Sequence, residues 1–343
     1  MAVKTGNYTY LLENTPSVLS FGAVGSKKES EGPLGQYFDV INPDSSFGES
    51  SWEKAESKMV QISVGQALSK GNFEADQIDM AFAGDLLNQC IGSVYGLRDL
   101  GIPFVGLYGA CSTMAESLAL AALFVDTSIA KKALAVTSSH FCSAERQFRF
   151  PLEYGGQRPP TAQWTVTGSG ACVVGESDAA PFVRAVTLGC IEDLGIKDAN
   201  NMGAAMAPAA AKTISRYLAD TRTKPEDYDM ILTGDLGQVG SALLEQLLEQ
   251  EKIHLQGRHQ DCGLLIYDRQ QQDVHAGGSG CGCAASVLCS FILPKIRQGT
   301  LGDVLFVATG ALMSPTSSMQ GESIPGIAHL VHLSSSRRRK GVE

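Results

Sequence analysis

Apolar residues along the chain follow two kinds of spacing. Within residues 52–62 they recur every three or four positions, which predicts a helix with one buried face, and an alanine-rich stretch at 204–214 predicts another. Residues 133–138 and 304–309 are short apolar runs typical of buried strands. Because such strands alternate with helices of about ten to fifteen residues, the pattern predicts βαβ units and mainly parallel sheets.

An internal repeat organises these elements. The segment ALSKGNFEADQIDMAFAGDL at 67–86 resembles YLADTRTKPEDYDMILTGDL at 217–236, and each reads as a helix end, an acidic turn, a strand and Gly-Asp-Leu. A second match aligns residues 109–112 with 280–283, each followed by a helix of small apolar residues and then a strand. The alternative is chance similarity between two ordinary βαβ units, but the two matches occur in the same order along the chain.

The repeat predicts an α/β protein made of two pseudo-symmetric halves, residues 1–180 and 181–343. Such halves should pack as a five-layered α/β/α/β/α sandwich. The spacing between the copies grows within the second half, which places an insertion of about twenty residues near 256–272.

Composition excludes several classes of protein. The formal net charge of −9 disfavours a nucleic-acid partner, since phosphate binding needs a concentrated basic face, and the single basic cluster lies at 337–340. The longest strongly apolar run, 118–125, is too short to span a bilayer, which takes about twenty residues. Nine cysteines without the spacing of a disulfide framework or a zinc site indicate reduced thiols. We therefore expect a soluble chain of cytosolic type without bound metal or cofactor.

The segment GLYGACSTMAES at 106–117 is the first candidate for chemistry. A strand ends in small residues and runs into a helix at Cys111, and Thr113 with Glu116 fits a capping box. A thiol at a helix N-terminus faces unpaired N–H groups and the positive end of the helix dipole, which favour the thiolate. The alternative is an inert core cysteine.

These residues carry a family resemblance that covers nearly the whole chain. GLYGACSTMAES resembles the active-cysteine segment of thiolases and ketoacyl synthases of the third type, and GGSGCGCAAS at 277–286 resembles their glycine-rich loop. A closer resemblance links the chain to the stage V sporulation AD family of endospore formers. It is carried by GPLGQYFD from Gly32, AGDLLNQ from Ala83, TSSHFCSAERQFRFPLEYGGQRP from Thr137, MAPAAAKTI from Met206 and ESIPGIAHLV from Glu322.

The closer resemblance implies a sporulation protein that binds dipicolinic acid, pyridine-2,6-dicarboxylate, free or as its calcium chelate, for uptake into the developing spore. It implies other stage V sporulation A membrane proteins as partners, and a place at the forespore inner membrane through them. Thiolase-like folds usually dimerise, so the resemblance also implies a homodimer.

Two departures from the condensing enzymes favour a binding protein over an enzyme. Where ketoacyl synthases of the third type have a His-Gln-Ala-Asn loop, this chain has Gly-Asp-Leu-Gly at 234–237, and the later asparagine position falls within 278–280. Asp235 would place a carboxylate near the thiol and disfavour both thiolate and oxyanion. His275 could substitute for the missing histidine. The alternative function is an acyltransferase in which Cys111 accepts the acyl group, with His140 or His275 as its base.

The expected ligand site lies at the carboxyl edge of the sheets. A flat dianion needs donors on two edges and an apolar slot for its ring. We expect His140 at a strand end to contribute, although it could equally be structural, and we prefer Arg149 over Arg146 as the cationic donor, although either could be solvated. The full set of expected ligand-binding residues is Cys111, Thr113, His140, Arg149, Asp235 and Ser279.

Overall fold

The computed structural model describes residues 2–148 and 157–337. Most of its strands form one continuous sheet path with two halves of identical pairing pattern. In each half three strands run parallel and two further strands add antiparallel at one side. The path in the first half is β6 (Phe104–Gly106), β5 (Met80–Gly84), β7 (Lys132–Ser139), β9 (Gly168–Gly175) and β3 (Ser17–Ser26). The path in the second half is β12 (His259–Asp261), β11 (Met230–Thr233), β14 (Asp303–Ala311), β15 (Gly326–Ser334) and β10 (Phe182–Thr187).

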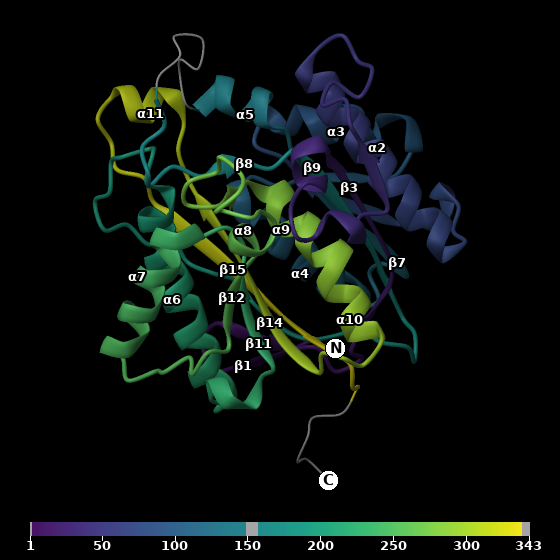
Figure 1. The fold of residues 1–343 in the computed structure, drawn as a ribbon. Helices are drawn as coiled ribbons and strands as arrows, with labels where there is room; N and C mark the ends of the chain where they lie inside the picture. Colours follow the sequence, from purple (N-terminus) through teal and green to yellow (C-terminus); the bar gives the residue numbers. More distant parts are fainter. Residues whose placement is uncertain (1, 149–156, 338–343) are drawn as a thin grey trace.

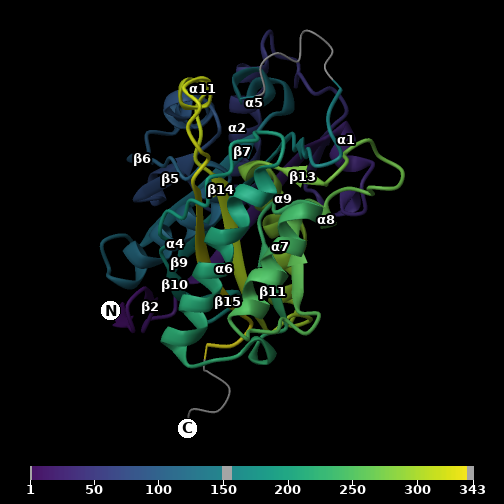
Figure 2. The same ribbon diagram turned by 90° about the vertical axis from the view of Figure 1, so that its left-hand side faces the viewer.

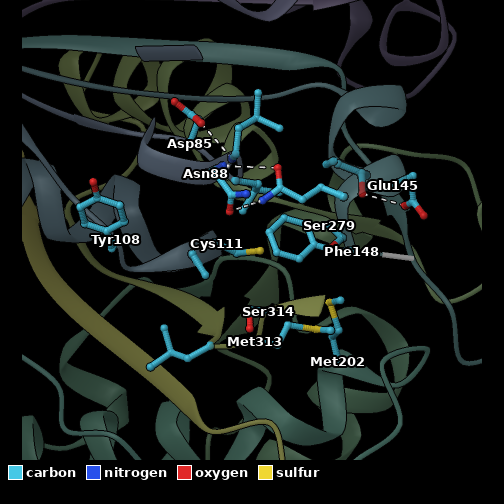
Figure 3. Close-up of a pocket in the computed structure, with 18 of the residues that line it drawn as sticks. Asp85, Asn88, Tyr108, Cys111, Glu145, Phe148, Met202, Ser279, Met313 and Ser314 are labelled. Atoms are coloured by element: carbon cyan, nitrogen blue, oxygen red, sulfur yellow. Dashed lines mark hydrogen bonds between the residues drawn. The ribbon is translucent and has the colours of Figure 1, made fainter. Parts of the chain in front are cut away.

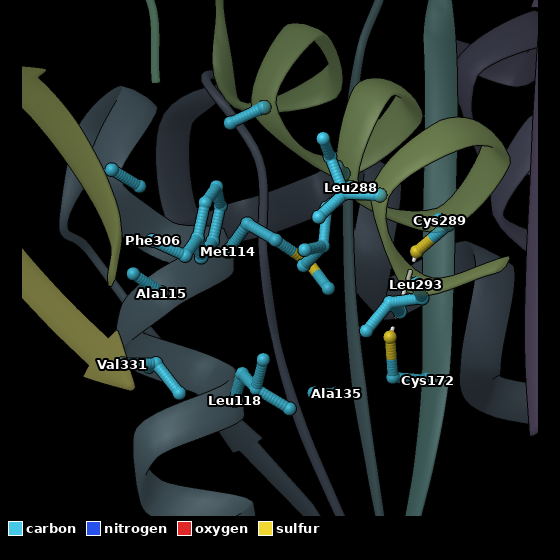
Figure 4. Packing of buried hydrophobic residues seen from close by; sticks show 14 of the residues in the cluster. Met114, Ala115, Leu118, Ala135, Cys172, Leu288, Cys289, Leu293, Phe306 and Val331 are labelled. Atoms are coloured by element: carbon cyan, nitrogen blue, oxygen red, sulfur yellow. Dashed lines mark hydrogen bonds between the residues drawn. The ribbon is translucent and has the colours of Figure 1, made fainter. Parts of the chain in front are cut away.

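The two half-sheets meet where β3 and β10 share one pair of residues, Ser17 and Phe182. Two central helices, α4 (Thr113–Asp126) and α9 (Cys281–Val287), lie between the half-sheets (Figure 1). Apolar side chains of both helices pack in one buried cluster with inward-facing residues of β7, β9, β14 and β15. Figure 4 shows this cluster, with Met114 and Leu118 of α4 beside Phe306 and Val331.

Alternation along the strands sends every second side chain to an outer helical layer. Leu134 and Val136 of β7 pack against α2 (Trp52–Gly71), whereas their neighbours face the centre. Leu305 and Val307 of β14 pack in the same way against α6 (Met202–Thr221) and α7 (Gly237–Gln250). Figure 2 shows α6 and α7 side by side over the second half-sheet. The structure thus has five layers, and the predicted α/β/α/β/α sandwich is confirmed.

The remaining elements are short or lie at the edges. These elements are β1 (Val3–Thr5), β2 (Thr9–Leu11), α1 (Lys27–Ser30), β4 (Val40–Asn42), α3 (Ile91–Leu97), α5 (Phe141–Phe148), β8 (Trp164–Thr165), α8 (Cys262–Leu265), β13 (Gly278–Ser279), α10 (Leu293–Arg297) and α11 (Pro315–Met319).

The predicted boundary between the two halves, at residues 180 and 181, stays a prediction, although β10 starts the second half-sheet close to it.

Glycines of the predicted glycine-rich segments allow close backbone packing. A Cβ on Gly282 would lie 2.4 Å from the carbonyl oxygen of Gly168, and a Cβ on Gly170 would lie 2.4 Å from that of Ala285. Contacts this short exclude a side chain, so α9 can approach β9 only because these positions are glycine.

Candidate functional site

Cys111 lies at the turn between β6 and the central helix α4, as the sequence predicts. It belongs to a short 3₁₀ turn, Ala110–Ser112, and Ala110 has a positive φ of 49°. Such a backbone is uncommon for a residue with a side chain and occurs where the surroundings fix it. Here β14 fixes it: a Cβ on Gly310 would lie 2.3 Å from the carbonyl oxygen of Gly109. The second half of the chain therefore holds the turn that carries the thiol.

The capping box predicted for α4 does not form. Thr113 donates its hydroxyl to the carbonyl oxygen of Ala110 at 2.6 Å, and the Ser112 hydroxyl donates to Gly109 O at 2.6 Å. The Glu116 carboxyl turns to the backbone N–H of Gly109 instead, and burial raises its pKa. The side chains of Ser112, Thr113 and Glu116 thus hydrogen-bond to the backbone of the turn itself.

A cavity of about 430 Å³ opens above the Cys111 thiol (Figure 3). Loops after β5 and β14, the helices α5 and α11 and the start of α6 form its walls. Cys111 and Ser279 lie at its floor, and Tyr108, two thirds exposed, lies at one side of the mouth. Its apolar lining comprises Leu86, Leu87, Ala110, Ala144, Phe148, Met202, Ala311, Leu312 and Met313.

Asp235 lies directly beneath this floor. It follows β11, is fully buried, and accepts hydrogen bonds from Gly280 N at 2.8 Å, from the Thr309 hydroxyl at 2.9 Å and from the Ser279 hydroxyl at 3.3 Å. The Cys111 thiol also hydrogen-bonds to it. Burial outweighs these donors and raises the pKa of Asp235 to about 7. A buried carboxyl group thus lies directly against the Cys111 thiol.

A second buried acid, Asp261, holds the turn that carries Asp235. Its carboxylate accepts from Leu236 N at 2.8 Å, from Gly237 N at 3.0 Å and from the Thr233 hydroxyl at 2.6 Å. Burial raises the pKa of Asp261 and lowers that of the neighbouring His259. Sequence reasoning missed Asp261, because a carboxylate after a short strand also occurs on ordinary surfaces.

Two further carboxyls meet at the cavity wall, with Asp85 in the lining and Glu56 behind it. Asp85 accepts hydrogen bonds from Leu87 N and from the backbone and hydroxyl of Ser93, at 2.7–2.9 Å. Glu56 of α2 accepts from the hydroxyls of Ser138 and Ser143. Burial and the charge of Asp85 raise the pKa of Glu56 to about 8. The place of Asp85 in the repeated Gly-Asp-Leu is a weak signal in the sequence, and Glu56 has none.

The structure brings three of the six expected ligand residues together, namely Cys111, Ser279 and Asp235. Thr113 is fully buried in the turn and does not line the cavity. Arg149 lies outside the described residues. Arg146 is ion-paired with Glu53 and stacks over Trp52, away from the cavity lining.

His140 is also absent from the cavity lining, which differs from the expectation. Its Nδ1 accepts from Cys142 N at 3.2 Å, so its Nε2 carries the proton and donates to the carbonyl oxygen of Ser45 at 2.8 Å. Burial lowers its pKa, so the ring stays neutral. His275 lies 3.3 Å from Asp273 and does not line the cavity either. Neither histidine thus faces the cavity that holds the Cys111 thiol.

The described lining of the cavity does not contain the cationic donor that the sequence predicts. Within residues 2–148 and 157–337 the lining includes Asp85 and Glu145 but no lysine, arginine or histidine. Among the described lining residues, donors for an anion are backbone N–H groups, hydroxyls, amides and the thiol. Asn88 and Gln147 supply amides at one wall, where they hydrogen-bond to each other at 2.8 Å.

Comparisons with known proteins agree with this architecture. The family model of stage V sporulation protein AD matches residues 6–334. Stage V sporulation protein AD of Bacillus subtilis (strain 168) is 48% identical over 325 residues, which cover 95% of this chain and 96% of that protein. The chain belongs to the stage V sporulation protein AD family. It is thus a member of a family of sporulation proteins.

Solved structures of condensing enzymes share the fold at low sequence identity. The 3-oxoacyl-[acyl-carrier-protein] synthase III of Aquifex aeolicus VF5 has a TM-score of 0.56 and 13% identity, and the match covers 93% of this chain and 99% of that one. Cerulenin-bound OleA of Xanthomonas campestris has a TM-score of 0.57 and 12% identity over 93% of this chain and 96% of that one. These likenesses confirm the predicted thiolase-like fold.

Two features are absent from the described residues. No described helix is both long and apolar enough to cross a membrane. Within the same residues no three histidine, cysteine, aspartate or glutamate side chains gather as a metal-ion site would require.

Proposed function

We propose that the chain binds pyridine-2,6-dicarboxylate in the cavity above Cys111, for uptake into the developing spore. The observation that carries the proposal is the cavity itself. It stands at the active-cysteine position of the condensing enzymes that the sequence resembles, yet the carboxyl group of Asp235 rather than a histidine lies against the thiol. Its volume lies within the range of about 300–1,000 Å³ common for small-molecule sites. Apolar walls around a polar floor suit a flat ring with charged edges.

The family membership supports this ligand through the resemblance stated above. Ring contacts would come from Leu87, Phe148 and Met202, and carboxylate contacts from Ser279, Cys111 and the amides of Asn88 and Gln147. The described lining holds no cationic side chain, so these contacts are hydrogen bonds and not ion pairs. If calcium were bound to the ligand, the carboxyl groups of Asp85 and Glu145 on the cavity walls would be available to coordinate it.

Calorimetry with purified protein tests the proposal. We expect saturable heat with pyridine-2,6-dicarboxylate and weaker binding of pyridine-2-carboxylate, which lacks one carboxyl group. Ser317→Trp should block the cavity, because Ser317 lines it from α11. Ser318→Trp is the matched control, since the adjacent side chain is exposed and does not line the cavity. No heat with the parent protein, or equal binding by both variants, would sink the proposal.

The acyltransferase alternative requires Cys111 to accept an acyl group. A carboxylate hydrogen-bonded to the thiol opposes the thiolate, and no histidine among the described residues lines the cavity. Mass spectrometry after exposure to acyl thioesters distinguishes the two functions. We expect Cys111 to remain unmodified; an acyl adduct on Cys111 would favour the enzyme.

The expected homodimer has a candidate interface at the edge strand β6. Among residues 2–148 and 157–337, β5 is the only strand that pairs with it, and β6 exposes more than a third of Phe104 and of Val105. The matching edge strand of the second half, β12, carries His259, Gln260 and Asp261 instead. An apolar exposed edge invites pairing with a second copy. Sedimentation should show a dimer for the parent and a monomer for Val105→Lys, whereas a monomeric parent would overturn the assignment.

Membrane partners would then deliver or receive the ligand at the forespore inner membrane. This part of the proposal follows from the family resemblance. Other stage V sporulation A proteins should co-purify with the tagged chain from sporulating cells. The tagged chain should leave the membrane fraction when those proteins are deleted, and a chain that stays there would count against them as its anchor.

A further inference from the structure

The floor of the cavity offers an anion fewer donors than its residues suggest. The Ser279 hydroxyl has one hydrogen, which it donates to Asp235 Oδ2 at 3.3 Å, and the Cys111 thiol is likewise hydrogen-bonded to Asp235. Both groups therefore present lone pairs to the cavity. In this arrangement the floor repels a carboxylate, and the charge of Asp235 beneath it adds to the repulsion.

One further acid and several buried thiols surround Asp235. The acid Asp261 faces it from the end of β12, and the thiol of Cys262 lies next to that acid at the start of α8. The thiols of Cys281 and Cys283 face it from α9, and the Cys111 thiol faces it from above. Burial raises the pKa of Cys262, Cys281 and Cys283 well above that of an ordinary thiol, so these groups are neutral.

We propose that Asp235 takes up one proton from solvent when the cavity binds an anionic ligand. This inference rests on the proposed function and adds a proton to its binding reaction. A proton on Oδ2 reverses the hydrogen bond to Ser279, because the Asp235 hydroxyl then donates to Ser279 Oγ. Ser279 turns its own hydrogen toward the ligand, and the Cys111 thiol, no longer held by a carboxylate, turns the same way. The only new covalent bond is the O–H bond of Asp235.

The Gly280 and Thr309 donors remain in place in either state. Gly280 N–H still points at Oδ2, which keeps a lone pair after protonation, and the Thr309 hydroxyl still points at Oδ1. The reversal therefore moves hydrogens and no backbone. One proton converts a floor of acceptors into a floor of donors, and it also removes the charge that opposes the ligand.

The direction of the pH dependence follows from burial. The pKa of Asp235 is about 7 in the empty site, and a nearby anion raises it further because the charged acid is then disfavoured. Little proton uptake is expected well below pH 7, where Asp235 already carries the proton. Above pH 7 uptake approaches one proton per site, and the dissociation constant rises toward tenfold per pH unit. The ligand carboxyls stay ionised throughout this range.

Calorimetry at pH 8 in buffers of different ionisation enthalpy measures this proton directly. With pyridine-2,6-dicarboxylate as the probe, we expect an uptake of about one proton per site for the parent, as linkage requires. Asp235→Asn should bind without net proton exchange, and its affinity should be nearly constant from pH 6 to 9. Asp76→Asn is the control, because it removes an exposed acid that does not line the cavity, and it should retain the uptake.

A second variant serves if Asp235→Asn fails to fold. Ser279→Ala removes the donor that protonation releases, so it should weaken binding at pH 6 and make the pH dependence shallower. Binding by the parent without proton uptake, uptake that persists in Asp235→Asn, or an unchanged pH profile in Ser279→Ala would each overturn the inference while leaving the proposed function standing. Absence of binding in every buffer would overturn both.

Discussion

Asp85 and Asp235 occupy matching places in the two halves of the molecule, but the donors of their hydrogen bonds come from different parts of the chain. Each follows a parallel strand in a repeated Gly-Asp-Leu, and each is buried. Asp85 accepts from Leu87 and Ser93, which belong to its own loop and the helix that follows. Asp235 accepts from Gly280, Ser279 and Thr309, and from Cys111 of the other half.

This difference separates an acid that holds its own loop from an acid that joins distant segments of the chain. The Asp85 carboxylate closes a local loop, so its loss should cost folding free energy. The Asp235 carboxylate joins three distant segments at the floor of a cavity, so its loss should change binding more than folding. A duplicated fold thus places equivalent side chains at both sheet edges, and neighbouring residues decide what each one does.

The largest expected effect is that of Asp85→Ala on stability. Removing the carboxylate leaves three buried donors without their acceptor, and each unsatisfied donor costs about 1–3 kcal/mol. Relief of the repulsion with Glu56 offsets part of this, so we expect a loss of about 3 kcal/mol. Urea unfolding measures it. Asp76→Ala, at an exposed acid, is the control and should change stability by less than about 0.5 kcal/mol.

Contact between the halves at the Cys111 turn should be the next most sensitive feature. In Gly310→Ala the new methyl group would lie 2.3 Å from Gly109 O, and relieving that overlap should cost about 2 kcal/mol and displace the turn. Gly65→Ala is the matched control, because nothing lies near its Cβ and alanine favours a helix interior. Equal stability of the two variants would show that β14 does not hold the turn.

Glu56→Gln should remove a pH dependence of stability that Asp85 helps to create. The folded pKa of Glu56 is about 8, against 4.5 for the ordinary carboxyl group. The contribution of protonated Glu56 to the unfolding free energy is fully present below pH 4.5 and is lost as the pH rises toward 8. We therefore expect the glutamine variant to be more stable than the parent at pH 9, on the order of 2 kcal/mol, with little difference at pH 4. Thermal melts across this range test it, and parallel curves would contradict the assignment.

The smallest expected effect on stability is that of Asp235→Asn. The side-chain oxygen still accepts from Thr309 or Gly280, and the loss of charge relieves the repulsion with Asp261. We expect a change of less than about 1 kcal/mol in unfolding free energy at pH 8. If this variant proves less stable than Asp85→Ala, the contrast between the two acids is wrong.

Much of the fold could be predicted because it depends on local pattern. The strands ending near Ser138 and Thr309 and the helices near residues 52 and 204 follow from apolar spacing, and the repeat predicted the matching halves. Cys111 follows β6 of the first half-sheet and Asp235 follows β11 of the second, so their meeting could be predicted only through the resemblance to the condensing enzymes.

The rest of the site depends on contacts between residues distant in sequence. His140 is held by the carbonyl oxygen of Ser45, which comes from a loop 95 residues earlier, and no local pattern indicates that loop. The capping box at Thr113 failed because the strained turn at Ala110 uses the hydroxyl itself. Glu56 reads in the sequence as a surface residue of a helix, and only the packing of α2 shows that it is buried.

The Asp261 carboxylate bears on how quickly a ligand could be captured. By accepting hydrogen bonds from Leu236 N and Gly237 N it fixes the loop of Asp235. Capture then requires no ordering of backbone, so little conformational entropy is lost at that step. Association should consequently proceed without a slow rearrangement, and differences in affinity among variants of the floor should arise mainly from how long the ligand stays.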